Sequence, residues 1–233
     1  MPFEVTQEDI LSVKADAAVI CIENTMIASA DPSSMRIAEV GGKPLEDELK
    51  KQKFLSVGRA RSFDPCGLPY KRIIATGAPR WMWGEGNELV VLRKCYESIF
   101  RIMEEEGLHS VVTPFLSASY YPFPREEAVR VAMEEVRLHN EKVIFVAHTP
   151  ELAELGLKPY RKPQITEYVG YYRDHAVFRL DNEQFAKIDI RVEMRNVEIR
   201  PYIEACYYME ADPSMLPLPQ SEIDRLRRIY DEM

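Results

Sequence analysis

The stretch GRARSFDPCGLPYKRIIATGAPRW, residues 58 to 81, carries the clearest pattern of secondary structure in the chain. Polar and apolar residues alternate over residues 57 to 63, which is typical of an antiparallel strand with one buried face. Residues 70 to 77 form an apolar run that ends in a turn at Gly77 to Pro79, and this pattern predicts a second strand. The stretch therefore places two successive strands in a central sheet.

Strands and helices alternate on both sides of this stretch. Apolar runs predict the strands, and amphipathic runs with capping residues predict the helices. The alternation predicts an α/β domain over residues 1–155, with a mixed sheet covered by helices on both faces. The further strands are expected at 16–22, 109–116 and 142–148, and the helices at 32–40, 43–52, 87–106 and 125–140.

The prolines and charges of residues 149–163 mark a domain boundary, and the composition changes beyond it. Eight of the 12 tyrosines lie at or after Tyr160, in short segments typical of strands. We expect a smaller C-terminal α+β extension over residues 165–233. Its predicted strands lie at 166–172, 175–181 and 186–193, and its predicted helices at 200–211 and 220–233.

An independent fold of about 70 residues without a disulfide or a metal is marginally stable. We therefore expect the extension to pack against the first domain or against a second copy of the chain, or to bind a protein partner. Tyr207 and Tyr208 are neighbours on a predicted helix, so they face different directions and only one is expected to pack inward.

Composition excludes several classes of function. The formal net charge of −8 argues against a nucleic-acid binder, because phosphate backbones attract clustered Lys and Arg. The acidic N-terminus and the short apolar runs predict neither a signal peptide nor a membrane span. Four cysteines without C-x-x-C spacing favour a reducing, cytoplasmic setting, and four histidines without ligand spacing predict no metal site. No cofactor motif is present either.

Four segments, in order, resemble the macro domain, an α/β module whose members bind ADP-ribose or remove it from proteins. The resemblance covers about residues 1–150 and implies a three-layer macro-like mixed sheet. Residues 8–20 resemble G-D-I-T followed by V-D-A-I-V, and residues 58–81 resemble G-x-A-x-x-T-x-G-Y-x-L-P-x-x-x-I-H-x-V-G-P-x-W. The other two matching segments are RIAEVGGKPLEDELKK, residues 36–51, and HSVVTPFLSASYYPFPREEAVRVA, residues 109–132.

The resemblance also implies a ligand site, made from the loops that correspond to those of the family. Asp9 corresponds to the acid that contacts adenine, although a helix cap is an equal alternative. Asn24 or Glu23 corresponds to the ribose-contacting pair, with a simple turn as the alternative for Asn24. The implied ligand-binding residues are Asp9, Ile10, Glu23, Asn24, Ser33, Ser34, Ser117, Ala118, Ser119, Tyr120 and Tyr121.

The sequence departs from the family in both phosphate loops. The family's G-G-G-G-V-D-G is replaced by SADPSSM, residues 29–35, so that Ser33 or Ser34 stands where hydrolytic members carry an aspartate. In the second loop, backbone N–H groups of residues 117–119 either form an anion site or belong to an ordinary connection. Its glycines are replaced by Ser119 and Pro122, which weakens the expected grip on a pyrophosphate.

These features lead to one preferred function and two alternatives. The preferred function is binding of ADP-ribose or a related phosphorylated ligand without hydrolysis, with no catalytic residue assigned. The first alternative is a protein interaction module whose cleft Tyr120 and Tyr121 close. The second is an active hydrolase in which Glu23 is the relocated acid. For any ligand site, the Asp31-Pro32 loop must face residues 116–122 across the carboxyl ends of the strands.

Overall fold

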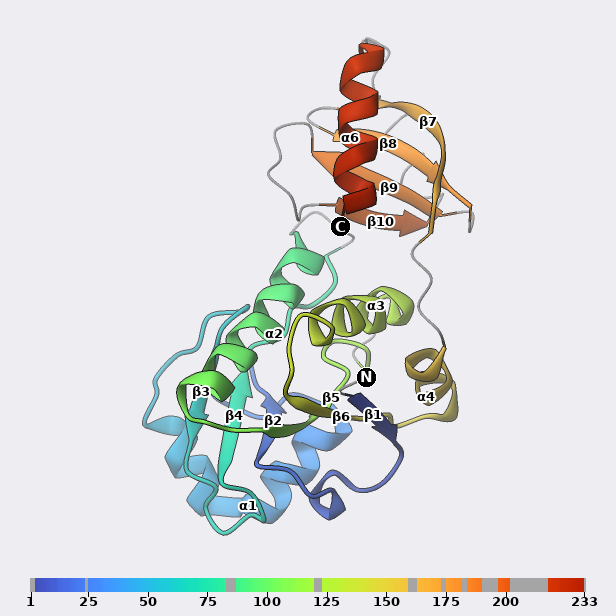
Figure 1. Ribbon diagram of the computed structural model, residues 1–233. Helices are drawn as coiled ribbons and strands as arrows, with labels where there is room; N and C mark the ends of the chain where they lie inside the picture. Colours follow the sequence, from blue (N-terminus) through green and yellow to red (C-terminus); the bar gives the residue numbers. More distant parts are fainter. Residues whose placement is uncertain are drawn as a thin grey trace. The chain divides into compact units, whose positions relative to one another are not determined.

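The structure is a computed structural model that describes residues 3–23, 25–82, 87–119, 123–158, 163–172, 175–181, 184–189, 197–201 and 218–232. The chain divides into two compact units, residues 1–160 and 161–233, and each unit has its own sheet (Figure 1).

The N-terminal unit contains a six-stranded mixed sheet in the order β1-β6-β5-β2-β4-β3. Neighbouring strands run parallel except β3, which pairs antiparallel with β4 at the edge. The strands are β1 (Phe3–Thr6), β2 (Ala17–Cys21), β3 (Ala60–Phe63), β4 (Arg72–Thr76), β5 (Ser110–Pro114) and β6 (Lys142–Val146). The helices are the 3-10 turn η1 (Ile10–Ser12) and α1 (Pro32–Lys50), α2 (Glu88–Glu105), α3 (Arg125–Val136) and α4 (Pro150–Leu157).

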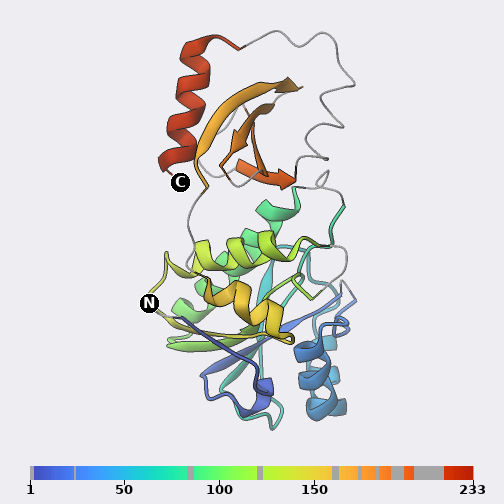
Figure 2. The same ribbon diagram turned by 90° about the vertical axis from the view of Figure 1, so that its right-hand side faces the viewer.

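Helices cover both faces of this sheet, which confirms the predicted three-layer α/β class. Alternate residues of β2 point to opposite faces, because side chains along a strand alternate in direction. Val19 packs with the apolar residues of α2 and α3, whereas Ile20 packs with those of α1. Figure 2 shows α1, in blue, on the other side of the sheet from α3 and α4. With both faces covered, every residue of β2 is buried, as in other central parallel strands.

The strands predicted from residues 57–63 and 70–77 are present as β3 and β4, paired Ala60 with Thr76 and Phe63 with Ile73. Two elements of this unit were not predicted. The helix α4 lies in the segment interpreted as a boundary, where Thr149 caps it through a bond from Leu152 N. The strand β1 is short and only partly buried, so its apolar pattern is weak.

The two helices predicted at 32–40 and 43–52 form one element, α1, with a sharp break at Gly42. Gly42 has φ 53° and ψ −148°, a backbone region open almost only to glycine. The break lets Ile37 and Leu49 on its two sides reach the same apolar cluster. The predicted stop at Gly41–Gly42 was therefore correct in place, although the chain re-enters a helix at once.

The C-terminal unit is a four-stranded antiparallel sheet with one described helix, the α+β class that was predicted. The strand order is β10-β9-β8-β7. The elements are β7 (Ile165–Tyr172), β8 (His175–Leu180), β9 (Gln184–Asp189), β10 (Val197–Pro201) and α6 (Gln220–Glu232).

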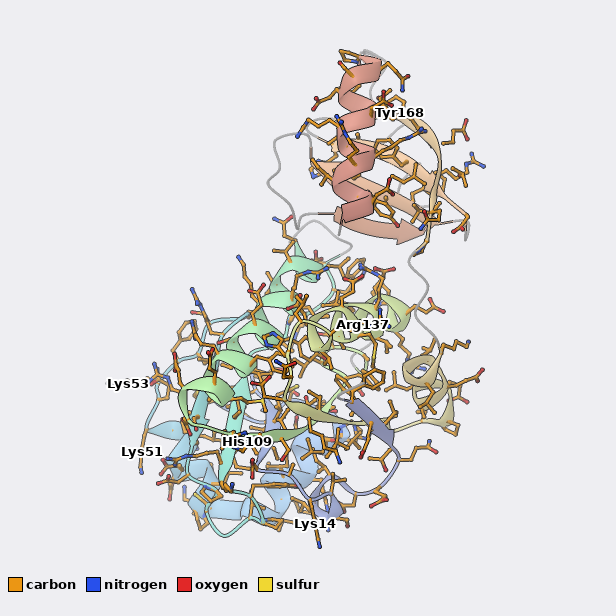
Figure 3. All side chains as sticks on the ribbon, viewed as in Figure 1. Lys14, Lys51, Lys53, His109, Arg137 and Tyr168 are labelled. Carbon is orange, nitrogen blue, oxygen red and sulfur yellow. The ribbon has the colours of Figure 1, made fainter. Side chains whose placement is uncertain are left out.

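A small apolar core joins α6 to this sheet. Leu226 and Tyr230 of α6 pack with Phe178 of β8, and Tyr168, labelled in Figure 3, packs against the same cluster. Tyr230 also donates its hydroxyl hydrogen to the carbonyl of Pro163, 2.7 Å away, at the start of the unit. The core of this unit therefore depends on aromatic residues, as the tyrosine-rich sequence indicated.

The helix predicted at residues 200–211 is wrong at its start, because Arg200 and Pro201 belong to strand β10 and pair with β9. A proline at the last strand position ends the pairing without breaking a central ladder. Tyr207 and Tyr208 lie outside the described residues. No helix in the described part of the chain combines the length and apolar surface that a membrane span requires.

The break in α1 yields a stability prediction. Gly42→Ala should lower the free energy of unfolding by about 1–2 kcal/mol, because a Cβ strains this left-handed backbone. Urea denaturation measures the change. Val40→Ala, at an exposed helical position nearby, is the control and should stay within about 0.5 kcal/mol of the wild type. If both variants lose the same free energy of unfolding, the backbone conformation at residue 42 does not require glycine.

Candidate functional site

A cavity of about 550 Å³ opens in the N-terminal unit where β2, β4 and β5 end. Its wall comes from the segments that follow these strands, from Val57 before β3 and from the start of α2. The carboxyl ends of the strands are the usual place for a ligand in an open α/β sheet. The lining residues are Cys21, Ile22, Glu23, Ser29, Asp31, Val57, Ala78, Pro79, Arg80, Met82, Glu88, Val91, Phe115, Ser117 and Ser119.

The first wall of the cavity is fixed by buried hydrogen bonds between β2 and α1. Ser34 Oγ accepts the N–H of Cys21 at 2.8 Å and donates to Asp31 Oδ2 at 2.5 Å. Asp31 Oδ2 also accepts the N–H of Ser34 at 2.9 Å, which makes Asp31 the cap of α1. The end of β2 and the start of α1 are thereby joined through two side chains that solvent does not reach.

His148, which follows β6, adds a third element to this wall. Its Nε2 lies 3.1 Å from Asp31 Oδ1 and 3.2 Å from Ser33 Oγ. Because an ionised carboxylate only accepts hydrogen bonds, we assign the hydrogen of this contact to Nε2. Both carboxylate oxygens of Asp31 therefore accept hydrogen bonds, Oδ2 from Ser34 and Oδ1 from His148.

The second wall is the loop after β5, which adopts a strained backbone. Ser117 has φ 64°, a left-handed conformation that non-glycine residues seldom adopt. Its hydroxyl donates to the carbonyl of Pro79 at 2.8 Å, and this bond ties the loop to the segment after β4. The N–H of Leu116 donates to the buried hydroxyl of Tyr96 on α2 at 3.0 Å. Burial raises the pKa of Tyr96 well above its usual value, so the hydroxyl stays neutral.

Charged side chains stand at the edge of the cavity. Arg80 Nη2 lies 2.8 Å and 2.9 Å from the two carboxylate oxygens of Glu23, and both side chains are partly exposed. Glu88, in contrast, is buried at the start of α2, where it accepts the N–H of Met82 at 2.6 Å. The ion pair joins the segments after β2 and β4 across the cavity.

The hydroxyl of Ser29, a residue of the cavity lining, has no hydrogen-bond partner in the part of the chain that the structure describes. Ser29 lies in a tight loop after β2, where its N–H donates to the carbonyl of Cys21 at 2.9 Å. Among the described residues, no group accepts from or donates to Ser29 Oγ. Buried polar atoms are nearly always hydrogen-bonded in folded proteins, so the lack of a partner at Ser29 Oγ is unusual.

Neither metal nor thiolate chemistry finds support here. In the described part of the chain, no three His, Cys, Asp or Glu side chains are grouped to hold a metal ion. Burial also raises the pKa of the Cys21 thiol well above its usual value, which keeps it in the weakly nucleophilic protonated form.

The structure brings together several of the residues that the sequence analysis named. Glu23, Ser117 and Ser119 line the cavity, and Asp31 lines it with them. Asp31, in the first loop, and Ser117 and Ser119, in the described part of the loop after β5, thus line the same cavity, as the expectation that these two loops face each other requires. Asn24, Tyr120 and Tyr121 lie outside the described residues, as does Pro122.

Five of the named residues are not among the lining residues. Ile10 is a core residue, and Ser33 and Ser34 are buried in the first turn of α1. The N–H of Ala118 donates to the carbonyl of Phe115 at 3.1 Å, so it is used within the turn. The fifth residue is Asp9.

Asp9 has the alternative role that the sequence analysis weighed equally. Its carboxylate accepts the N–H of Leu11 at 2.9 Å, which caps η1, and it pairs with Arg36 at 2.8 Å. The bond from Leu11, with that from Arg36, lowers the pKa of Asp9 below its usual value. Contact between Asp9 and adenine stays a prediction.

Most of the lining residues were not named as ligand-binding residues, among them Asp31 and Arg80. The Asp31-Pro32 loop was expected beside the site, and the cap position of Asp31 places its carboxylate at the strand ends. A cap residue that follows a buried strand is the signal that could have found it. Arg80 carried no such signal, because its partner Glu23 lies 57 residues away in the sequence.

A family model described as Macro domain matches residues 26–132. A macro domain-containing protein of Mesorhizobium japonicum is 28% identical over 156 residues, which are 64% of this chain and 88% of that protein. A protein of Pantoea vagans named O-acetyl-ADP-ribose deacetylase 1 is 28% identical over 137 residues, 57% of this chain and 80% of that protein.

Solved structures share the fold of the same unit. The macrodomain of Oceanobacillus iheyensis with ADP has a TM-score of 0.62 at 19% identity, over 66% of this chain and 87% of that one. The macrodomain of Trypanosoma brucei in complex with ADP-ribose has a TM-score of 0.59 at 22% identity, over 66% of this chain and 67% of that one. The N-terminal unit therefore has the macro-domain fold and matches the family model over residues 26–132, which confirms the resemblance seen in the sequence.

The buried bonds of the first wall give a stability prediction. Ser34→Ala should lower the free energy of unfolding by about 1–3 kcal/mol, because the N–H of Cys21 and an oxygen of Asp31 lose a buried partner. Ser33→Ala, one residue earlier and also buried, removes only a contact with His148 and should cost less. Urea denaturation ranks the two variants. If Ser33→Ala lowers the free energy of unfolding more than Ser34→Ala does, the structural role assigned to Ser34 is refuted.

Proposed function

We propose that the N-terminal unit binds ADP-ribose or a related nucleotide in the cavity at the strand ends, without rapid hydrolysis. The observation that carries this proposal is a cavity of about 550 Å³ at the ends of β2, β4 and β5, a volume that suits a small ligand. Structural neighbours with ADP and with ADP-ribose support the choice of ligand.

The lining offers both kinds of contact that a nucleotide needs. Val57, Met82 and Val91 supply an apolar surface for a sugar face or a flat base. The hydroxyl of Ser119 supplies a donor and an acceptor for a sugar hydroxyl or a phosphate, and that of Ser117 supplies an acceptor. The strained backbone at Ser117 supports the same assignment, because such strain is concentrated at functional sites.

A second candidate is hydrolysis of an ester of ADP-ribose. It is favoured by Asp31, a carboxylate that lines the cavity, and by relatives named O-acetyl-ADP-ribose deacetylase. A carboxylate acts as a general base only if an oxygen can accept a proton from a water beside the scissile bond. Asp31 already accepts two bonds from Ser34 and contacts His148. These contacts support binding without turnover as the first choice.

The proposal also concerns the cellular compartment. Cys21 and Cys95 are buried free thiols, and Cys66 is a partly buried one. Reducing compartments keep thiols in this form, so we propose the cytoplasm as the location. Extraction under a thiol-trapping reagent tests this point, since a disulfide in the protein from its native cell would contradict it.

Titration with ADP-ribose tests the binding proposal. At a ligand concentration of about 100 Kd, the free energy of unfolding should rise by roughly 2.7 kcal/mol. Ser119→Ala should weaken binding by about two- to tenfold, since it removes one hydrogen-bonding group from the cavity lining. Ser62→Ala is the matched control, because Ser62 is also half-buried but lies outside the cavity lining. If millimolar ADP-ribose does not raise the free energy of unfolding, the proposal is refuted.

Release of acetate from O-acetyl-ADP-ribose separates the two candidates. Under saturating substrate we expect turnover to be absent or at least about 100-fold slower than that of an active macro-type deacetylase, because positioned acid–base catalysis is missing. Fast release that Asp31→Asn abolishes would establish the hydrolase. Fast release abolished only by Glu23→Gln would instead establish Glu23 as the relocated acid.

A further inference from the structure

The described lining of the cavity carries more negative than positive charge. Glu23, Asp31 and Glu88 contribute carboxylates, whereas Arg80 is the cationic side chain among the lining residues that the structure describes. A pyrophosphate is anionic, so such a lining repels it unless a cation is placed against it. Arg80 is therefore the side chain of the described lining that can offset the negative charge of a phosphate.

The backbone beside Arg80 is held in place from the opposite wall. The carbonyl of Pro79, the preceding residue, accepts the hydroxyl hydrogen of Ser117 at 2.8 Å. Gly77, three residues earlier, pairs with Val57 in an isolated bridge. The segment that carries Arg80 is therefore fixed on two sides, and its side chain extends from a rigid base.

The contact between the side chains of Arg80 and Glu23, in contrast, is easily exchanged. The side chains of Arg80 and Glu23 are 63% and 37% exposed. An ion pair with this exposure contributes about 0–1 kcal/mol, because water solvates both groups well when they separate. A phosphate offers the guanidinium more acceptor oxygens and more negative charge than a carboxylate does. Replacing Glu23 by a phosphate oxygen as the partner of Arg80 is thus favourable.

We propose that Arg80 is the phosphate-binding side chain of this cavity and that Glu23 is its internal competitor, which occupies the guanidinium until a phosphorylated ligand displaces it. The inference rests on the proposed function and deepens it, since it assigns the phosphate contact to a side chain. An Arg contact compensates for the glycines that the phosphate loops lack at Ser119 and Pro122. The ligand class selected is therefore one with a phosphate near the ends of β2 and β4.

Calorimetric titration of the full chain with ADP-ribose and with adenosine tests the assignment. Arg80→Gln should weaken ADP-ribose binding about tenfold or more, because a charge-assisted hydrogen bond is lost, and leave adenosine binding unchanged. Arg80→Lys should restore part of the affinity through its charge. Glu23→Gln should strengthen ADP-ribose binding, by roughly fivefold at most, since it removes a weak competitor.

Arg72→Gln is the matched control. Arg72 lies at the other end of β4 and also pairs with carboxylates, those of Asp64 and Glu106, but it does not line the cavity. Its substitution should leave the affinity for ADP-ribose unchanged, while the net charge falls as in Arg80→Gln. If both variants lose the same affinity for ADP-ribose, the loss is due to the overall charge of the protein, and the assignment of Arg80 is overturned.

The remaining outcomes separate this inference from the proposed function. If wild-type protein binds ADP-ribose and Arg80→Gln binds it equally well, the proposed function stands and the role of Arg80 is refuted. If Glu23→Gln weakens binding, Glu23 contacts the ligand and is not a competitor. If the wild type binds no ADP-ribose at millimolar concentration, both proposals fall.

Discussion

The buried hydroxyl of Ser34 is the contact on which the cavity depends. It accepts the last N–H of the central strand β2 and donates to Asp31, the residue that begins α1. A strand end and a helix start both leave backbone groups unpaired, and burying such groups without partners is costly. One serine and one aspartate satisfy both ends, so the chain can turn from β2 into α1 inside the protein and leave a wall that faces the cavity.

Rigid and exchangeable contacts are separated in this site. The contacts of Ser34, Asp31 and Ser117 are buried, and removing a buried partner costs about 1–3 kcal/mol. The Glu23–Arg80 pair is exposed and costs little to break. The buried bonds determine where the loops lie, whereas the exposed pair leaves a charge that can respond to a ligand. This division explains how a cavity without glycine-rich loops can keep a defined shape and still offer an anion a partner.

Much of the fold followed from local patterns, but only part of the site did. β2, β3 and β4 were predicted because their apolar patterns are strong, whereas α4 was missed because its prolines and charges resemble a linker. In the site, Glu23, Ser117 and Ser119 were named from the family's motifs. Ser33 and Ser34 were named from the place of the family's aspartate, whereas Asp31, two or three residues earlier, lines the cavity. Without glycines this segment has no fixed point for an alignment, so the sequence alone does not show which of its side chains faces the cavity.

The sequence by itself determined the α/β order of the N-terminal unit and the break at Gly42, because each depends on residues close together along the chain. It also determined the resemblance to the macro domain, because the four matching segments can be recognised one by one and follow the family's order. Tertiary structure decided which side chains meet at the strand ends. His148 contacts Asp31 across 117 positions, and Arg80 meets Glu23 across 57. These contacts arise because parallel strands from distant segments end at one edge of the sheet. No periodicity in the sequence records which loops share that edge, so the charge and the shape of the cavity appear only in the folded chain.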